Sequence, residues 1–262
     1  MAHPLNVINL EGGYAGQAVI HDCSMDVSAG EIVVIMGGSG SGKSTFLRHL
    51  IGLKPPMQGD VALFGKSLYG VSEFERLRLL KDIGVAFQSG ALLSSLTVRE
   101  NVALPLVENT KLPRDMIDIV VRMKLDFVGL LDKEHLLPSE LSGGMLKRAA
   151  VARAIALDPR LVFMDEPSAG LDPVIAAALD ELIIQLRDSL GMSVVVVTHE
   201  LESAFKIADR IVVLDRGHII FSGSVDDIKN STNQRIQNLI NRVAEEEEIS
   251  PELRLQRLFG DV

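Results

Sequence analysis

The chain is poor in cysteine and has no long apolar run. Cys23 is the only cysteine among 262 residues, which excludes an intrachain disulfide and a cysteine-built metal site and agrees with a reducing compartment. We interpret Cys23 as a small core residue. Unbroken apolar runs such as residues 174–179 and 194–197 are short, whereas a helix needs roughly 20 apolar residues to cross a bilayer. The N-terminus has no basic segment followed by an apolar one, so we expect no export signal and a cytoplasmic location.

Basic residues are outnumbered by acidic ones, 26 to 35, and large aromatic residues are scarce. The formal net charge is −9, whereas nucleic-acid binding usually shows as a basic patch and attraction to anionic lipid needs clustered lysine or arginine. We therefore expect neither nucleic acid nor a lipid surface as a direct partner. Tryptophan is absent and only two tyrosines are present, so few side chains could stack on a flat ligand. The length suits one large domain, or one domain with a subdomain.

Glycine, in contrast, is concentrated in one loop. Residues 37–44 have the sequence GGSGSGKS, which follows the apolar run 32–36 and precedes a helical pattern at 46–51. A strand, a loop and a helix in this order are the context in which such a motif binds phosphate. The glycines let backbone N–H groups face an anion, and the helix adds its positive dipole end. Lys43 is placed to reach the β- and γ-phosphates, and the Ser44 hydroxyl can ligate magnesium. A plain glycine-rich turn is the alternative.

Short apolar strands alternate with helical stretches, a pattern typical of a parallel α/β sheet. The strands are expected at residues 32–36, 83–87, 161–164, 193–197 and 210–214. The first four end at the phosphate loop, at Gln88, at Asp165-Glu166 and at Thr198-His199. Because ligands bind beyond the carboxyl ends of parallel strands, we expect these residues to form one site.

The remaining segments divide the chain into a core and an insertion. Residues 5–10 and 18–27 are expected to form a small antiparallel edge, and a hairpin is expected to follow Asp215. Strand signal disappears over about 88–156, where prolines at 105, 113 and 138 break the helices, so we expect an inserted helical subdomain there. The core then covers about 5–87 and 157–240, with helices at 176–190, 201–208 and 225–243. Residues 241–262 form an extension with an acidic, solvated hinge and a short amphipathic helix that we expect to dock on a partner subunit or on a neighbouring copy.

Two carboxylates and a histidine carry the catalytic hypothesis. Adjacent residues at a strand end point in different directions, so Asp165 is expected to face a magnesium ion while Glu166 acts as general base on a water near the γ-phosphate. An acidic pair that serves only solubility is the alternative. His199 could hydrogen-bond the γ-phosphate and hold the attacking water. A lone histidine at a strand end is usually structural, but this one shares its sheet edge with Lys43.

A second glycine-rich element occupies residues 141–145 and has the sequence LSGGM. Ser142, Gly143 and Gly144 open a helix, so a hydroxyl, backbone amides and a helix dipole could bind an anion there. The phosphate loop of one chain already holds its own nucleotide. We therefore expect the second anion site to serve the ATP of a partner chain.

These motifs, together with the SAGLD sequence at 168–172, occur in the order found in ATP-binding-cassette (ABC) ATPases, which the chain resembles from about residue 5 to 240. The resemblance implies an α/β P-loop NTPase (RecA-like) core with an antiparallel β edge and an inserted α-helical subdomain. It also implies hydrolysis of ATP with Mg²⁺ by a homodimer, in which each ATP lies between one Lys43 loop and the opposite Ser142 loop. Hydrolysis then opens the dimer.

The resemblance assigns roles residue by residue, with Tyr14 stacking on adenine and Asp172 lying along the dimer interface. The residues expected to act in catalysis are Lys43, Gln88, Glu166 and His199. The residues expected to ligate the metal are Ser44, Gln88 and Asp165. The residues expected to bind nucleotide are Tyr14, Gly37, Gly38, Ser39, Gly40, Ser41, Gly42, Lys43, Ser44, Thr45, Ser142, Gly143, Gly144 and Asp172.

Departures from the commonest pattern indicate a subfamily. Met145 replaces the usual glutamine, and Lys147-Arg148 stands where glutamine-arginine is frequent. With residues 87–92 and 96–106, the chain looks like the ATPase of phospholipid transporters of the maintenance-of-lipid-asymmetry (Mla) type. This likeness implies an integral membrane permease, an MCE-domain lipid-binding protein, sometimes a STAS-domain partner, and a peripheral position on the cytoplasmic face of the inner membrane. The alternatives are another cargo, such as a lipoprotein, amino acid or metal, or a non-transport ABC protein acting on nucleic acid or ribosomes.

Overall fold

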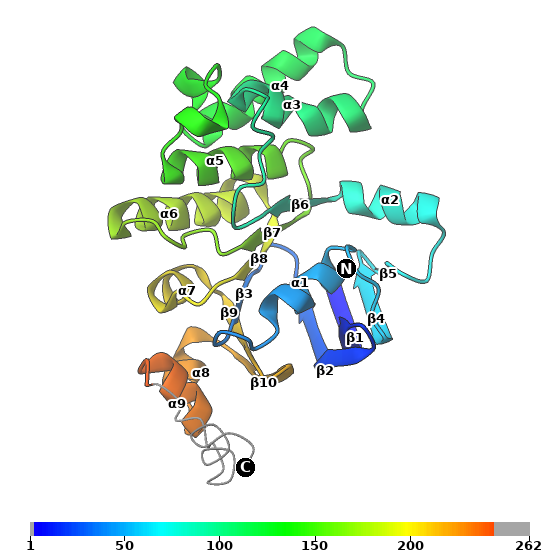
Figure 1. Ribbon diagram of the computed structural model, residues 1–262, viewed down its shortest axis with the longest axis vertical. Helices are drawn as coiled ribbons and strands as arrows, with labels where there is room; N and C mark the ends of the chain where they lie inside the picture. Colours follow the sequence, from blue (N-terminus) through cyan, green and yellow to red (C-terminus); the bar gives the residue numbers. More distant parts are fainter. Residues whose placement is uncertain (1–2, 244–262) are drawn as a thin grey trace, which may run out of the picture.

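A six-stranded sheet forms the centre of the molecule, with the strand order β10-β9-β3-β8-β7-β6 (Figure 1). The structure is a computed structural model that describes residues 3–243. The strands are β3 (Ile32–Met36), β6 (Ile83–Ala86), β7 (Leu161–Asp165), β8 (Ser193–Val197), β9 (Arg210–Asp215) and β10 (His218–Gly223). All pairs are parallel except the β9–β10 hairpin. The predicted parallel strands and the hairpin are confirmed, with ends that differ by one residue at most.

Both faces of this sheet are covered, so its central strands are largely apolar. Every residue of β3 and β8 is buried, as expected for parallel strands between two layers. Side chains alternate between the layers: Ile32 and Val34 pack in one hydrophobic cluster, and Val33 and Ile35 pack in the other. The alternation follows from the two-residue period of a strand.

A four-stranded antiparallel sheet lies beside the core, in the order β2-β1-β4-β5. Its strands are β1 (Leu5–Tyr14), β2 (Gln17–Val27), β4 (Gln58–Leu63) and β5 (Lys66–Ser67). The antiparallel edge is confirmed, but the strands expected at 5–10 and 18–27 are longer, and β4 and β5 were not predicted. Half of β4 is the polar sequence QGD, so its period-2 signal is weak. Cys23 lies buried in β2, where its thiol donates to the Gly217 carbonyl at 3.2 Å and burial raises its pKa to about 11.

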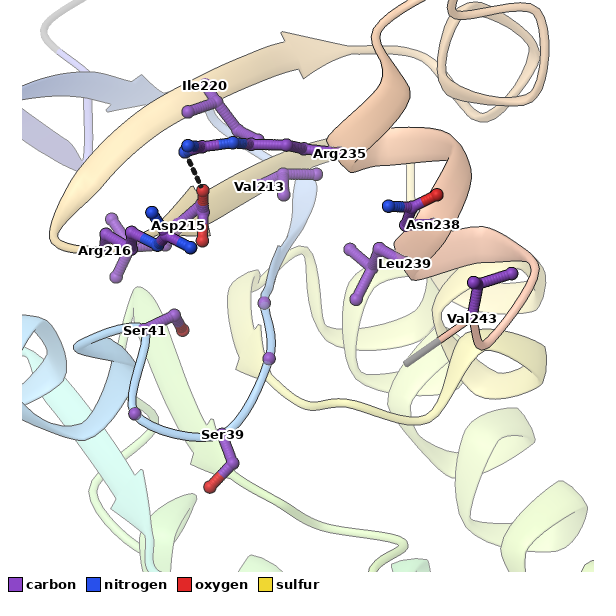
Figure 2. A pocket seen from close by; sticks show the side chains of 14 residues that line it. Ser39, Ser41, Val213, Asp215, Arg216, Ile220, Arg235, Asn238, Leu239 and Val243 are labelled. Carbon is purple, nitrogen blue, oxygen red and sulfur yellow. Dashed lines mark hydrogen bonds and ion pairs between the residues drawn. The ribbon is translucent and has the colours of Figure 1, made fainter. Parts of the chain in front are cut away.

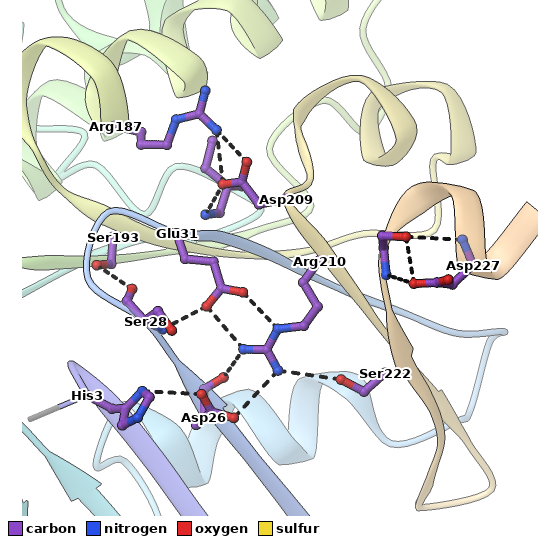
Figure 3. Close-up of polar contacts among 12 residues, drawn as sticks. His3, Asp26, Ser28, Glu31, Arg187, Ser193, Asp209, Arg210, Ser222 and Asp227 are labelled. Atoms are coloured by element: carbon purple, nitrogen blue, oxygen red, sulfur yellow. Dashed lines mark hydrogen bonds and ion pairs between the residues drawn. The ribbon is translucent and has the colours of Figure 1, made fainter.

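Arg210 ties the two sheets together (Figure 3). It begins β9, and its guanidinium donates to both carboxylate oxygens of Glu31, at 2.7 and 3.1 Å, and to the Asp26 carbonyl in β2 at 2.7 Å. The hydrogen bond with Glu31 holds the pKa of Arg210 above its ordinary value. A guanidinium shared between two elements fixes their orientation because its donors are rigidly arranged.

The predicted helical insertion is confirmed and lies at one end of the molecule (Figure 1). It contains α3 (Val98–Asn109), α4 (Arg114–Phe127), α5 (Gly143–Ala154) and two 3₁₀ turns, η1 (Leu131–Lys133) and η2 (Pro138–Glu140). Pro113 and Pro138 stand at the start of a helix and of a 3₁₀ turn, as expected, but the prediction that Pro105 breaks a helix is wrong. Pro105 lies inside α3, which is held at its start by a capping box of Thr97 and Glu100 and through its length by buried Val98, Val102 and Leu106.

The other helices pack against the core. They are α1 (Lys43–Leu50), α2 (Glu73–Lys81), α6 (Pro173–Leu190), α7 (Leu201–Ile207), α8 (Val225–Lys229) and α9 (Gln234–Ile240). Helix α2 was not predicted because it buries only Leu79 and so has no apolar stripe. The single helix expected over 225–243 is wrong: Asn230 ends α8, and the Asn233 side chain caps α9. The expected terminal amphipathic helix lies outside the described residues. Within residues 3–243, no helix is both long enough and apolar enough to cross a membrane.

Candidate functional site

The loop after β3 is shaped by glycines at positions where a side chain would not fit. Gly42 caps α1 with φ 105°, and a Cβ added there would lie 2.7 Å from Ile20 Cδ1. No side chain caps α1 and no acidic residue stands in its first turn, so the free N–H groups of that turn face no negative charge from the helix itself. The buried Ser41 hydroxyl has no hydrogen-bond partner among the described residues. This cradle fits a phosphate group.

Lys43 is folded back onto this loop. Its Nζ donates to the carbonyls of Gly37 and Gly38 at 2.7 and 2.9 Å. Burial lowers its pKa, against the opposing charges of Glu166 and Asp165. An anion in the cradle would give the ammonium an acceptor of opposite charge in place of neutral carbonyls, a stronger partner for a buried cation. Ser44, the next residue, is exposed on the first turn of α1, whereas Thr45 is buried.

Glu166 is held by contacts to β8 and to the residues that follow it. Its backbone N–H donates to the Val197 carbonyl at 2.8 Å, and its φ of 47° lies in the left-handed region, which costs a side chain roughly 1–2 kcal/mol. One carboxylate oxygen accepts from the Thr198 hydroxyl at 3.2 Å, and the other lies 2.9 Å from His199 Nδ1. The structure therefore brings Glu166 and His199 into direct contact, as their common sheet edge predicts.

Asp165 ends β7 beside this group and is half-buried. Burial raises its pKa, the charge of Glu166 raises it further, and Lys147, Arg48 and Lys43 oppose the shift. The expected metal donors Asp165, Gln88 and Ser44 are one carboxylate, one amide and one hydroxyl. This donor set fits Mg²⁺, which takes few protein ligands and completes its shell with phosphate oxygens and water.

Lys147 makes two hydrogen bonds at this site that the sequence did not indicate. Its buried amine, on α5, donates to the carbonyl of Gln88 and to the carbonyl of Glu166, the latter at 2.9 Å. Burial lowers its pKa, against the charges of Glu166 and Asp165. The only available signal was a lysine where glutamine is frequent. Gln88 itself is exposed and lies two residues after the end of β6.

Tyr14 lies at the end of β1 beside α1. Its hydroxyl accepts from Arg48 Nη1 at 2.5 Å, and Lys54 Nζ lies 3.6 Å from the ring centroid. A hydrogen bond with Thr45, and then one with Arg48, lowers its pKa despite some burial. The ring is 40% exposed. An aromatic ring is thus presented next to the helix that begins at the phosphate loop.

Residues 142–144 form a second helix start. Ser142 caps α5 by accepting from the Met145 N–H at 3.3 Å, and the first turn carries no acidic residue. A Cβ at Gly144 would lie 2.5 Å from Ile175 Cγ2, so glycine lets α5 approach α6 closely. Asp172 caps α6 through two N–H donors at 3.1 Å. In the described part of the chain, the hydrogen bonds of Ser142 join it to Met145 and Leu146, and the close contacts of Gly143 and Gly144 are with Leu171 and Ile175; none involves the phosphate loop.

A cavity of about 330 Å³ opens on the other side of the loop. Figure 2 shows the loop with Ser39 and Ser41 on one side and α9 with Asn238 and Leu239 on the other. Arg235 and Asp215 also line the cavity, and the Arg235 guanidinium donates to the Asp215 carboxylate at 2.5 Å. The residues that line this cavity do not include the acidic pair or His199, so the catalytic hypothesis concerns the sheet edge and not this cavity.

Comparisons with known proteins agree with this geometry. The ABC transporter family profile matches residues 20–169. The chain is 40% identical over 222 residues, 84% of each chain, to the intermembrane phospholipid transport system ATP-binding protein MlaF of Haemophilus influenzae. It is 36% identical over 92% of its length, and 70% of the relative's, to a protein of Mycobacterium leprae named as a probable ribonucleotide transport ATP-binding protein.

Solved structures give the same result. CbiO1 of Clostridium perfringens, described as part of an ABC transporter complex, superposes with a TM-score of 0.81 at 28% identity over 98% of both chains. A dimeric ATP-binding cassette bound to ADP and Pi superposes with a TM-score of 0.77 at 28% identity, over 84% of this chain and 98% of that one. The fold and the likeness to Mla-type ATPases predicted from the motifs are confirmed. The chain therefore belongs to the ABC transporter family, as a nucleotide-binding ATPase of that family.

Proposed function

We propose that this ATPase powers the transport of phospholipid through a separate membrane permease, from the cytoplasmic face of the inner membrane. Support comes from the 40% identity, over 84% of the chain, to a relative named for intermembrane phospholipid transport. The same likeness favours an integral membrane permease, an MCE-domain lipid-binding protein and a STAS-domain protein as partners. The net charge of −9 favours attachment through such proteins over direct adsorption on anionic lipid.

In the proposed site, the residues at the sheet edge divide the work. The Lys43 amine leaves the carbonyls of Gly37 and Gly38 and binds the β- and γ-phosphates. The N–H groups of residues 37–45 bind the remaining phosphate oxygens. Bound Mg²⁺, held by Ser44, Asp165 and Gln88, would stabilise charge on the phosphates as a Lewis acid. Tyr14 stacks on adenine through the exposed part of its ring. The adenine then lies beside Lys54 or displaces it from the ring.

Glu166 acts as the general base in this proposal. Each carboxylate oxygen has two lone-pair directions, so Glu166 can hold His199 and Thr198 and still accept a proton from a water. The observation that carries the proposal is the contact between Glu166 and His199 at 2.9 Å. That contact fixes the carboxylate at the same edge as the phosphate loop, and it leaves the exposed imidazole to orient the water and the γ-phosphate.

The active form in this proposal is a homodimer that encloses two ATP molecules. Residues 142–144 present a helix start without acidic side chains and make no described contact with the phosphate loop of their own chain. An anion site that is separate from the chain's own nucleotide is explained by a partner chain's ATP. A solved relative described as a dimer in a post-hydrolysis state supports this arrangement.

The Glu166→Gln variant tests the catalytic assignment. We expect kcat for ATP hydrolysis to fall by roughly 10²- to 10⁴-fold, the usual contribution of a general base, while ATP binding measured by calorimetry is retained. Glu202→Gln is the matched control, because Glu202 is an exposed carboxylate on α7, and its kcat should equal that of the wild type. An unchanged hydrolysis rate in Glu166→Gln would remove Glu166 from this role.

The cargo needs a separate experiment, because one relative is named for ribonucleotide transport. We expect an integral membrane protein to accompany the chain when its native assembly is purified in detergent. In vesicles containing that assembly, ATP should drive movement of labelled phospholipid and not of labelled ribonucleotide. Transport of the ribonucleotide alone would select the second cargo, and absence of any membrane protein from the purified assembly would contradict the transport proposal.

A further inference from the structure

Helix α5 touches both candidate ATP sites of the proposed dimer. Its first residues, Ser142 and Gly143, are exposed and present the helix start, which is proposed to meet the nucleotide of the partner chain. One turn later the same helix carries Lys147, whose buried amine donates to the carbonyl of Glu166 in the chain's own site. A helix is a rigid element, so a displacement of its first turn also displaces Lys147.

The two carbonyls that accept from Lys147 belong to two different segments that leave the central sheet. The Gln88 carbonyl belongs to the segment that leaves the central sheet after β6 and enters the helical insertion. The Glu166 carbonyl belongs to the segment that leaves the same sheet after β7. One amine on the insertion donates to both carbonyls; its bond to Glu166 is buried and its bond to Gln88 is partly buried, and a carbonyl shielded from water needs such a donor. The position of α5 is therefore tied to the backbone of the proposed base.

The backbone of Glu166 is in a conformation that needs such support. Its φ of 47° is unfavourable for any side chain, and conformations of this kind persist only when surrounding contacts impose them. The shortest hydrogen bonds on the Glu166 backbone are its N–H bond to Val197 on the sheet side and the bond from the Lys147 amine to its carbonyl. Loss of the amine would leave the carbonyl side held by a single long bond, at 3.4 Å, from the Ala169 N–H.

We propose that Lys147 is a positioning residue that couples the start of α5, which meets the partner's ATP, to the backbone of Glu166 in its own site. This inference rests on the proposed function, namely on Glu166 as base and on the dimer. When the partner's ATP binds Ser142 and Gly143, it fixes the position of α5. Lys147 then holds the Glu166 carbonyl, and the carboxylate is aligned with the water that attacks the chain's own ATP.

A simpler role for Lys147 is to neutralise the buried acidic pair, because its amine interacts with the charges of Glu166 and Asp165. The two roles differ in what a variant must keep. Neutralisation requires a positive charge nearby, whereas positioning requires donors that reach both carbonyls. A matched lysine offers a control: Lys206 also donates to a backbone carbonyl, that of Ala177 at 3.0 Å, but on an exposed side of α7.

The decisive variants are Lys147→Met, which loses both the charge and the donors, Lys147→Arg, which keeps both, and Lys147→Gln, which keeps a donor without the charge. In the purified full assembly we expect Lys147→Met to lower kcat roughly 10- to 100-fold, the cost of a misplaced catalytic group, with KM for ATP little changed. Lys147→Arg should restore most of kcat, and Lys206→Met should leave it unchanged. Thermal unfolding shows whether each variant is folded. Lys147→Gln separates the two roles: positioning predicts a smaller loss of kcat than in Lys147→Met, because one amide can serve one carbonyl, whereas neutralisation predicts an equal loss, which would overturn the proposal. Lys147→Gln also takes the place of Lys147→Met if that variant does not fold.

Two double variants separate positioning from a general structural effect. Residues that act as one unit give non-additive losses, so adding Lys147→Met to Glu166→Gln should lower kcat little further. The same non-additivity is expected with Ser142→Ala. Multiplicative losses in both cycles, or a wild-type kcat in Lys147→Met, would overturn the coupling while leaving Glu166 as base. An unchanged rate in Glu166→Gln alone would instead overturn the proposed function on which the coupling rests.

Discussion

At the residue scale, Tyr14 offers an exposed ring next to the helix that starts at the phosphate loop. Stacking of a base on an aromatic ring contributes roughly 1–3 kcal/mol, so we expect Tyr14→Ala to raise the Kd for ATP about 10-fold or more. Tyr14→Phe keeps the ring and loses only the hydroxyl, with its hydrogen bonds to Thr45 and Arg48, so its Kd should stay close to that of the wild type. Calorimetric titration measures both. Inorganic triphosphate, which has no base, should bind all variants equally. A parallel loss of triphosphate affinity would mean that α1 is distorted through Arg48.

Asp165 makes the nucleotide-free protein less stable as its carboxyl ionises. Burial and the charge of Glu166 raise its folded-state pKa, so the folded protein holds this proton more tightly than the unfolded chain does. The loss of folding stability caused by ionised Asp165 is therefore absent below the ordinary carboxyl pKa of about 3.9 and reaches its full size above the raised folded-state pKa. We expect Asp165→Asn to unfold at a higher temperature than the wild type near neutral pH, without nucleotide or metal.

The difference should shrink as the pH falls from about 8 to about 4, because the wild-type carboxyl takes up its proton first in the folded state, which removes the cost of the buried charge. Thermal unfolding followed by circular dichroism over this range measures it. Asp126→Asn, at an exposed position of α4, is the matched control and should change the unfolding temperature little. A lower unfolding temperature for Asp165→Asn at neutral pH would show that the carboxylate stabilises the empty site.

Residue types in fixed spacing were enough to predict which residues gather at the sheet edge, because phosphate chemistry requires particular groups. Lys43, Asp165, Glu166 and His199 follow strand ends, and parallel strands bring such ends together. The sequence could not show that Lys147 joins Gln88 to Glu166. That contact depends on how far the helical insertion approaches the sheet, which is a tertiary distance with no local signature.

At the element scale, α5 lies against β6 at a glycine. A Cβ on Gly84 would lie 2.2 Å from the Ala154 carbonyl oxygen, and this atom is backbone that cannot rotate away. We expect Gly84→Ala to lower the free energy of unfolding by about 1–3 kcal/mol, the usual cost of overpacking. Urea denaturation measures the change as a lower midpoint. Gly38→Ala, whose Cβ would meet nothing within 4 Å, should leave the midpoint unchanged. Equal midpoints for Gly84→Ala and the wild type would show that α5 shifts without cost.

Elements with a strong local period were predictable, and those without one were not. The strand β3 is a continuous apolar run and β8 is one after Ser193, so their positions follow from sequence. Helix α2 and strand β4 lack a buried face of regular period and were missed. The break between α8 and α9 was also missed, although Asn233, a residue that favours helix starts, marks it.

At the scale of the whole molecule, no described hydrogen bond joins the two anion sites of one chain. The phosphate loop and residues 142–144 share none of the described hydrogen bonds or close glycine contacts. The order of the motifs could predict this only through family resemblance, because separation in space depends on where the helical insertion sits. An assembly of two chains with twofold symmetry would pair each loop with the opposite helix start and so complete both sites at once.

Mixed dimers test that pairing. Lys43→Ala removes the phosphate-binding amine, and Gly143→Asp places a negative charge at the start of α5, where it suits the helix dipole but repels a phosphate. We expect each variant alone to hydrolyse almost no ATP. When the two are co-expressed with different tags and purified through both, every dimer has one site with an intact Lys43 loop and an intact opposite helix start. Because one of its two sites is intact, the mixed dimer should hydrolyse ATP at up to about half the rate of the wild-type dimer. If co-purified dimers stayed as inactive as the parents, each site would be built from a single chain.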